Sequence, residues 1–307
     1  MISYPLYASP EGRTPFDEYK NEANGVPELK PIDAEVLSCY KKYEDAVNNG
    51  IVHTLTPHGF VQPEKGNLQH LYSSDCDVAK KVRSYHNGFT RATRRIYHNK
   101  CPYCVLSEPN TLEHILPKGK YPEYAVHAYN LIPCCSKCNS HKGEAIVNSI
   151  NGLPHTLNFY YHDPEKFQFL QVDCFLDAHN QPLFSYKLIF PSDADPILAS
   201  IITNHFNRLH LIERYNEEVI QTYTAIEPII KSLCSGKNIS EALDAISNYL
   251  ANISSYYGIN HHEIALLRCL ISSSQYHTYL SRLLEPGLIC TIISERKISD
   301  KIELKIT

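Results

Sequence analysis

Apolar residues at helical spacing mark the first predicted helix, over residues 34–48, with Val36, Leu37, Tyr40, Tyr43 and Val47 on one face. Residues 1–33 are rich in Pro and Gly and show little period, and a second stretch without period runs from 49 to about 74. Residues 78–99 form a basic helical pattern in which Gly88 is a candidate break. The N-terminal part of the chain is therefore predicted to be helical, with irregular connections.

Beyond Glu144 the pattern changes to the alternation typical of β-strands. Residues 167–175 and 184–190 alternate on either side of a turn-like stretch at 178–181, which predicts a hairpin. Pro196 then opens a long helical pattern that continues past Tyr223, and Pro228 is expected to kink or end it. Two more helices are predicted over 240–256 and 262–284, and residues 302–306 alternate as a short terminal strand.

These elements predict an α+β protein with four parts. An N-terminal region covers 1–77, a basic helix with a cysteine-rich module covers 78–146, a β-hairpin extension covers 147–195, and a helical domain with the short strand covers 196–307. No apolar stretch is long enough to cross a bilayer and no secretory signal is present, so we expect a cytoplasmic protein without membrane contact.

The net charge of −4 conceals a strong asymmetry along the chain. Residues 79–142 hold 11 Lys or Arg against three Glu and no Asp, which gives +8, while the remaining residues hold 18 basic against 30 acidic side chains, which gives −12. Such a distribution is typical of a protein with one face toward phosphates. Arg91, Arg94 and Arg95 share one face of the predicted basic helix and are candidate nucleic-acid contacts.

Five of the eleven cysteines fall between residues 101 and 138, and four of them form two Cys-x-x-Cys pairs. Cys101, Cys104, Cys135 and Cys138 suit one tetrahedral structural zinc ion, because each pair supplies two thiolates from a tight turn. Cys134 could replace Cys135 in this set, although the spacing favours Cys135. The six scattered cysteines indicate a reducing compartment rather than a disulfide framework.

The residues between the two cysteine pairs contain a candidate catalytic set. Glu113 and His114 are adjacent, and Asn130 and Asn139 follow at intervals of sixteen and nine residues. Phosphodiester hydrolysis needs a base for water and a cation for the developing charge, and an imidazole with oxygen ligands supplies both. Oxygen ligands favour a hard ion such as magnesium or manganese. If the second cysteine pair opens a helix, Asn139 projects from its first turn toward the strand that carries Glu113.

The runs TLEHILPKGK and NLIPCCSKCNSHKG resemble the HNH endonucleases of the zinc-knuckle type. The resemblance implies a ββα-metal module on a treble-clef zinc site, a β-hairpin packed on a helix, that cleaves DNA. It implies that His114 is the general base, that Glu113 and Asn139 bind the catalytic Mg²⁺ or Mn²⁺, and that Asn130 fixes the loop and orients His114. It also places Lys142 near phosphate. Lys118 is a further candidate nucleic-acid contact, and Lys118, Lys120 and Lys142 offer an alternative path for DNA if the arginine face does not bind it. His141 is an alternative ligand to Asn139.

Residues 159–164, with the hairpin and helices after them, loosely resemble the C-terminal extension of HNH proteins in phage-defence operons, including the nuclease subunit of Septu-type systems. This implies an antiviral role and an ATPase partner subunit, or a second copy of this chain, bound by the C-terminal helices. Double-stranded DNA is the expected substrate, in preference to single strands. The competing interpretation is a non-catalytic zinc module that binds nucleic acid or an ATPase.

Overall fold

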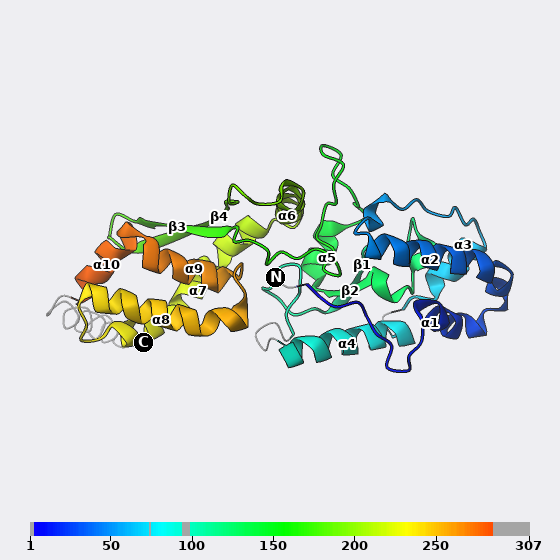
Figure 1. Ribbon diagram of the computed structural model, residues 1–307, viewed down its shortest axis with the longest axis horizontal. Coiled ribbons are helices and arrows are strands. Elements are labelled where there is room, and N and C mark those ends of the chain that lie inside the picture. Colours follow the sequence, from blue (N-terminus) through cyan, green and yellow to red (C-terminus); the bar gives the residue numbers. More distant parts are fainter. Residues whose placement is uncertain (1–2, 74, 94–98, 285–307) are drawn as a thin grey trace, which may run out of the picture. The chain divides into compact units, whose positions relative to one another are not determined.

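The computed structural model of the 307-residue chain describes residues 3–73, 75–93 and 99–284, with the side chains of residues 90–93 left aside. The chain forms two compact units, Met1–Gln168 with Phe190–Leu211 and Phe169–Ile189 with Ile212–Thr307. Over the described residues each unit combines helices with a two-stranded antiparallel sheet (Figure 1). The predicted α+β class is therefore confirmed.

Four helices precede the cysteine-rich segment in the first unit: α1 (Pro15–Glu22), α2 (Asp33–Asn48), α3 (Glu64–His70) and α4 (Asp77–Thr93). Helix α2 agrees with the predicted helix. Helices α1 and α3 lie where irregular structure was predicted, because eight and seven residues are too few for a period to stand out. Helix α1 instead carries a local start signal, a capping box between Thr14 and Asp17. Helix α4 continues through Gly88, so the expected break is absent.

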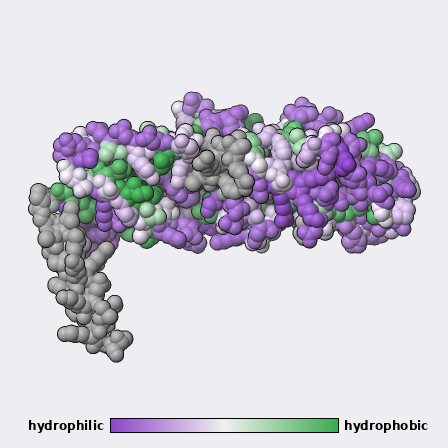
Figure 2. All heavy atoms as spheres, turned by 90° about the horizontal axis from the view of Figure 1, so that it is seen from below, coloured by the Kyte–Doolittle hydropathy of each residue, from purple (hydrophilic) through white to green (hydrophobic). Residues whose placement is uncertain are grey.

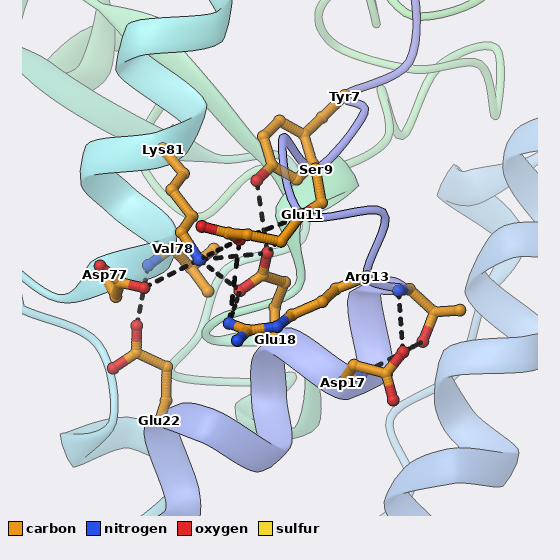
Figure 3. Close-up of polar contacts among 11 residues, drawn as sticks. Tyr7, Ser9, Glu11, Arg13, Asp17, Glu18, Glu22, Asp77, Val78 and Lys81 are labelled. Atoms are coloured by element: carbon orange, nitrogen blue, oxygen red, sulfur yellow. Dashed lines mark hydrogen bonds and ion pairs between the residues drawn. The ribbon is translucent and has the colours of Figure 1, made fainter.

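An ion-pair network ties the N-terminal segment to α4 (Figure 3). The Lys81 ammonium group lies 2.8 Å from Glu11, 3.1 Å from Glu18 and 2.9 Å from Asp77. Glu18 is 1% exposed and also approaches Arg13 at 3.9 Å. A buried carboxylate needs such partners, because an unpaired charge in the interior is strongly destabilising. The network fixes α1 against the start of α4, and α4 in turn packs against β2 (Leu131–Cys134).

The centre of the first unit consists of β1 (Thr111–His114), β2 and α5 (Ser136–Lys142). The two strands are antiparallel, with Glu113 opposite Ile132 and His114 opposite Leu131. Cys135 caps the N-terminus of α5, and α5 contacts β1. Helix α6 (Pro196–Arg208) completes the unit, and its N-cap Asp195 accepts hydrogen bonds from the first turn. Short 3-10 helices connect these elements: η1 (Ala23–Gly25), η2 (Pro27–Ile32), η3 (Val52–Thr54), η5 (Pro122–Tyr124) and η6 (Ala128–Asn130).

Tyrosine rings form much of the core around these elements. Tyr19, Tyr40, Tyr43 and Tyr124 are at most 1% exposed, and their rings meet at centroid distances of 4.8–6.4 Å. The Tyr124 hydroxyl donates to the Cys39 carbonyl in α2 at 3.2 Å, and the Tyr43 hydroxyl of α2 donates to Asn130 Oδ1 at 3.0 Å. The core thus holds the loop between β1 and β2 against α2.

The second unit contains the predicted hairpin, formed by β3 (Leu170–Leu176) and β4 (Pro182–Leu188). Helices α7 (Leu211–Cys234), α8 (Ile239–Tyr257), α9 (His262–Ser272) and α10 (Ser274–Leu284) follow, and α9 and α10 pack on β3. The hairpin turns at residues 177–181, where Asn180 has a φ of 58°. Asn tolerates this left-handed conformation better than most residues.

Two predicted helices are each divided in the structure. The pattern from Pro196 forms α6 and α7, which are separated at His210, where φ is 52°. Pro228 lies inside α7, which continues through it, with Ile226 and Ile230 buried on either side. The predicted helix over 262–284 is divided into α9 and α10 by Ser273 in an extended conformation. The predicted terminal strand at 302–306 lies outside the described residues.

Among the residues that the structure describes, no helix is both long and apolar enough to cross a membrane.

Candidate metal centre and active site

Four buried cysteine side chains converge between the start of the cysteine-rich segment and α5. The sulfur atoms of Cys101, Cys104, Cys135 and Cys138 all lie within 4.8 Å of one another, and those of Cys104 and Cys135 are 3.9 Å apart. Tetrahedral zinc with Zn–S bonds of about 2.3 Å requires sulfur atoms roughly 3.8 Å apart. The four residues expected from the sequence therefore fit a metal ion such as zinc.

Cys134 is also buried here, and its sulfur lies 4.0 Å from that of Cys101. Cys134 belongs to β2, and its thiol donates to the Cys135 carbonyl at 3.3 Å. The Cys135 sulfur instead accepts a hydrogen bond from the Cys138 amide at 3.4 Å. A sulfur that accepts an amide hydrogen bond is stabilised as a thiolate, the form that binds metal. The geometry therefore favours Cys135 over Cys134 as the ligand.

The first cysteine pair is held in a tight turn. The Val105 amide donates to the Cys101 carbonyl at 2.8 Å, and Val105 has a φ of 58°. A β-branched residue in this region is strained, so the surrounding contacts must impose the conformation. Burial raises the pKa of Cys101 to about 12, so the thiolate form here requires a compensating cation. These features fit a metal-binding turn.

A pocket of about 250 Å³ lies beside the sheet, and its lining includes Glu113, His114, Lys118, Asn139 and Glu144. Glu113 and His114 belong to β1, and Lys118 lies in the loop after it. Asn139 belongs to α5, and Glu144 follows the end of that helix. The structure thus brings the predicted Glu113, His114 and Asn139 to one pocket. Because the strand ends at His114, both neighbouring side chains line the same space.

His114 is 9% exposed, and its orientation is fixed by the loop between the strands. Its Nε2 atom lies 2.9 Å from the Ala125 carbonyl, which can only accept, so Nε2 carries the proton. No hydrogen-bond partner for Nδ1 occurs among the described residues, and Nδ1 is not sealed from solvent. Burial, aided by Lys118 and Lys142, lowers the pKa of His114 to about 4. The ring is therefore neutral near pH 7, with Nδ1 as an available base.

Asn139 is oriented by a two-step hydrogen-bond relay. The Thr111 hydroxyl donates to the Cys134 carbonyl at 2.9 Å, so its oxygen remains to accept from Asn139 Nδ2 at 3.0 Å. The relay settles which end of the amide is nitrogen and leaves Oδ1 as the group without a partner among the described residues. Asn139 thus presents a neutral oxygen ligand beside the pocket.

Asn130 is completely buried and uses its side chain to close the loop between the strands. Its Nδ2 donates to the carbonyls of Leu116 and Tyr124, both at 3.0 Å, and its Oδ1 accepts from the Leu116 amide at 2.7 Å. The Ala125 carbonyl that holds His114 follows directly after Tyr124. Asn130 therefore holds the loop that contacts His114 and does not line the pocket, and its role in orienting His114 stays a prediction.

Lys142 is not exposed for the phosphate contact that was expected of it. It is 2% exposed, and its ammonium group is 2.6 Å from Glu113 Oε1 and 3.0 Å from the His114 carbonyl. Burial raises the pKa of Glu113, and the charge of Lys142 opposes that shift. In this structure Lys142 holds the end of α5 against β1, and contact with phosphate would require the ion pair to open.

Two residues of α6 that support the candidate site carry no sequence signal. Arg208 donates to the Lys142 carbonyl from Nη2 at 2.7 Å and from Nε at 3.1 Å, which caps the C-terminus of α5. His205 holds the Tyr103 carbonyl, inside the first cysteine pair, at 2.9 Å. One helix therefore fastens both the metal centre and the pocket. Only a contact map between distant segments could have identified it.

The other residues predicted to contact nucleic acid or metal do not gather at one place. The Lys118 ammonium lies 4.7 Å from the centre of the Tyr72 ring, and Lys120 lies 5.6 Å from that of Tyr121. The His141 ring lies 5.0 Å from the His210 ring and does not line the pocket. The predicted face of Arg91, Arg94 and Arg95 falls outside the side chains that the structure describes.

Comparison with known proteins gives two partial relatives. The chain is 24% identical to protein ea31 of Escherichia phage lambda over 180 residues, which covers 50% of this chain and 59% of that protein. It is 38% identical to Septu protein PtuB of Bacillus thuringiensis over 77 residues, which covers 21% of this chain and 30% of that protein. Neither match spans two thirds of the relative. No protein-family model and no solved structure matches the chain.

Proposed function

We propose that this chain is a metal-dependent endonuclease of the HNH type that hydrolyses phosphodiester bonds in DNA. One observation carries the proposal: the Ala125 carbonyl fixes the tautomer of a buried, neutral His114 and leaves Nδ1 without a partner among the described residues, and His114 lines the same pocket as Glu113 and Asn139. A general base requires a nitrogen that is unprotonated at the working pH, has a free lone pair and belongs to a residue of the pocket.

In the proposed reaction His114 Nδ1 removes the proton from the attacking water. Glu113 and Asn139 would hold Mg²⁺ or Mn²⁺, since a carboxylate and an amide oxygen are ligands that hard cations prefer. When bound, such an ion neutralises charge on the phosphate and on the leaving oxygen. Asn130 acts through the loop, because its hydrogen bonds position the carbonyl that orients His114. The four cysteines would hold structural zinc and take no part in the chemistry.

The partial similarity to a Septu protein supports a role in antiviral defence, and we extend the proposal to it. A defence nuclease requires control of its activity, and the second unit is the part of the chain available for a partner. We propose that its helices bind an ATPase subunit or a second copy of this chain.

The competing function is a zinc module that binds nucleic acid or a partner without cleavage. The Lys142–Glu113 ion pair favours it, because an ammonium group already occupies one side of the proposed metal ligand. Substitution of His114 separates the two functions, since a binding module does not depend on a base.

The test is cleavage of plasmid DNA by His114→Ala under single-turnover conditions with Mg²⁺ or Mn²⁺. We expect the rate to fall by about 10²- to 10⁴-fold, as is typical for loss of a general base, with zinc content and folding unchanged. His141→Ala is the matched control, because His141 is also near α5 and lies outside the pocket lining. Cleavage by His114→Ala at the parental rate would exclude the mechanism.

A further inference from the structure

The charge of the proposed metal ligand is already balanced within the protein. The Lys142 ammonium group lies 2.6 Å from Glu113 Oε1, and the two side chains are 2% and 5% exposed. Its other contacts are carbonyl groups, that of His114 at 3.0 Å and that of Gly143 at 3.5 Å. Arg208 holds the Lys142 backbone from the other side. Lys142 is therefore a counter-ion for Glu113 that the protein itself supplies. Its described contacts, together with the Arg208 contact to its backbone, hold it in place.

The rest of the pocket adds no net negative charge among the described residues. Its lining contains two carboxylates, Glu113 and Glu144, and the ammonium of Lys118, while Lys142 adds a second ammonium through its ion pair. Asn139 supplies a neutral oxygen. Sites that bind Mg²⁺ without substrate usually gather more than one uncompensated carboxylate, and sites with fewer complete their coordination with substrate phosphates.

We infer that this pocket takes up its divalent cation together with a DNA phosphate, because Lys142 cancels the charge of Glu113 and the phosphate restores the missing negative charge. The inference rests on the proposed function and deepens it. Binding of the two ligands is then coupled, and by linkage each must raise the affinity for the other by the same factor. Free protein would be poorly loaded, and DNA would complete the active site.

The first test measures Mn²⁺ binding by electron paramagnetic resonance with the full-length His114→Ala chain, which retains both proposed ligands and does not turn over. We expect Mn²⁺ to bind at least tenfold more tightly when a short DNA duplex is bound. Duplex alone, and His114→Ala/Asn139→Ala with duplex, correct for ions that gather around DNA itself. Equal Mn²⁺ affinity with and without duplex would overturn the inference.

The second test changes the counter-ion. Lys142→Gln keeps a hydrogen-bond donor without the charge, whereas Lys142→Arg keeps the charge. In the His114→Ala background we expect Lys142→Gln to tighten DNA-free Mn²⁺ binding at least tenfold and to reduce the effect of duplex, and Lys142→Arg to retain the parental coupling. Unchanged DNA-free affinity in a folded, zinc-loaded Lys142→Gln chain would contradict the role of Lys142. If that chain does not fold, the first test decides alone.

The two proposals fail in distinguishable ways. Cleavage by the parent chain together with Mn²⁺ binding that ignores DNA would refute the coupling and leave the nuclease function intact. Coupled Mn²⁺ and DNA binding without any cleavage would refute the nuclease function, and the pocket would then be a metal-dependent DNA-binding site.

Discussion

His114 and His205 are both buried, yet their ring nitrogens meet different neighbours. His114 uses Nε2 to hold a carbonyl and keeps Nδ1 available, whereas His205 donates from Nε2 to Tyr103 and accepts at Nδ1 from the Leu157 amide at 3.2 Å. A proton on Nδ1 of His205 would therefore destroy a buried hydrogen bond. The same burial that makes His114 a candidate base makes His205 a structural residue.

This difference predicts how acid affects folding. Burial lowers the pKa of His205 to about 3, below the unfolded value near 6.5, so its contribution to stability is complete above about pH 6.5 and is lost as the pH falls toward 3. Each such histidine lowers the free energy of unfolding by about 1.4 kcal/mol per pH unit in that window. We expect urea unfolding of His205→Gln to show a pH slope smaller than that of the parent by about this amount.

The comparison with the parent is essential, because thiol protonation and zinc loss also destabilise the protein in acid. These effects are common to both chains and cancel in the difference. A His205→Gln slope identical to the parental slope between pH 6 and 4 would show that His205 is already protonated in the folded protein.

At the scale of elements, α6 is the helix on which both halves of the candidate site depend. Arg208 caps α5, and His205, one turn earlier, holds the first cysteine pair. Helix α6 ends at Arg208, and α7 begins at Leu211 after only Leu209 and His210. The segment that fixes the site thus continues in the chain, almost without interruption, into the second unit.

Removal of the α5 cap is expected to impair catalysis more than binding. In Arg208→Met the Lys142 carbonyl loses both donors, and the end of α5 can shift relative to Glu113. We expect kcat to fall by about 10- to 100-fold, as for other residues that orient metal ligands, with KM and zinc content near parental values. Arg208→Lys should restore part of the rate. Asn207→Ala, an exposed neighbour on the same helix, is the matched control.

If Arg208→Met lowered the zinc content together with kcat, or if Arg208→Lys gave no rescue, Arg208 would have a general structural role rather than a positioning one.

In the candidate metal centre, the adjacent residues Cys134 and Cys135 are expected to have different roles. We expect Cys135→Ser to lose zinc and to unfold the centre of the first unit, because metal binding and folding are coupled in such sites. Cys134→Ser should keep one zinc ion per chain, because Cys134 lies on β2 outside the favoured ligand set. Elemental analysis of the purified proteins measures both outcomes. Well-folded parent protein without zinc would remove the proposal of a zinc centre.

For the whole molecule, basic charge is unevenly distributed along the chain. The basic residues concentrate in the segment 79–142 of the first unit. Exposed apolar side chains occur in both units, among them Val61 and Ile150 in the first and Phe175, Ile220 and Tyr256 in the second. In Figure 2 hydrophilic residues cover most of the visible face, and apolar residues form smaller patches among them. The basic segment fits the proposed contact of the first unit with DNA.

The basic segment predicts a steep dependence of DNA binding on salt. If Arg91, Arg94 and Arg95 each neutralise one phosphate, their triple Ala variant should lower the slope of log K against log salt by about 2.7. Sequence preference should hardly change, because phosphate contacts carry no base information. Titration of a labelled duplex at several salt concentrations measures the slope. The matched control is a triple Ala variant of Lys187, Lys231 and Lys237 in the second unit.

An unchanged slope in the arginine variant would mean that this helix face is solvated and does not contact DNA. The path of the DNA would then be sought near Lys118 and Lys120, which lie on the loop that follows His114.

Sequence reasoning succeeded where the signal is local. The spacing of Cys101, Cys104, Cys135 and Cys138 specified four ligands that the fold brings within 4.8 Å. Alternation specified the β3–β4 hairpin, and the apolar period specified α2. It failed at α1 and α3, which are too short to show a period, and at the breaks near His210 and Ser273, where backbone conformation rather than composition ends a helix.

By itself, the sequence determined the residue types of the candidate site and their order, because metal ligands and a base need particular side chains at short spacing. Only the tertiary structure decided how they are used. It placed the charge of Lys142 against Glu113, left Nδ1 of His114 rather than Nε2 without a partner among the described residues, and brought Arg208 to α5 from 66 residues away. Such contacts join segments distant in sequence, and their partners and burial arise only when the chain has folded around them.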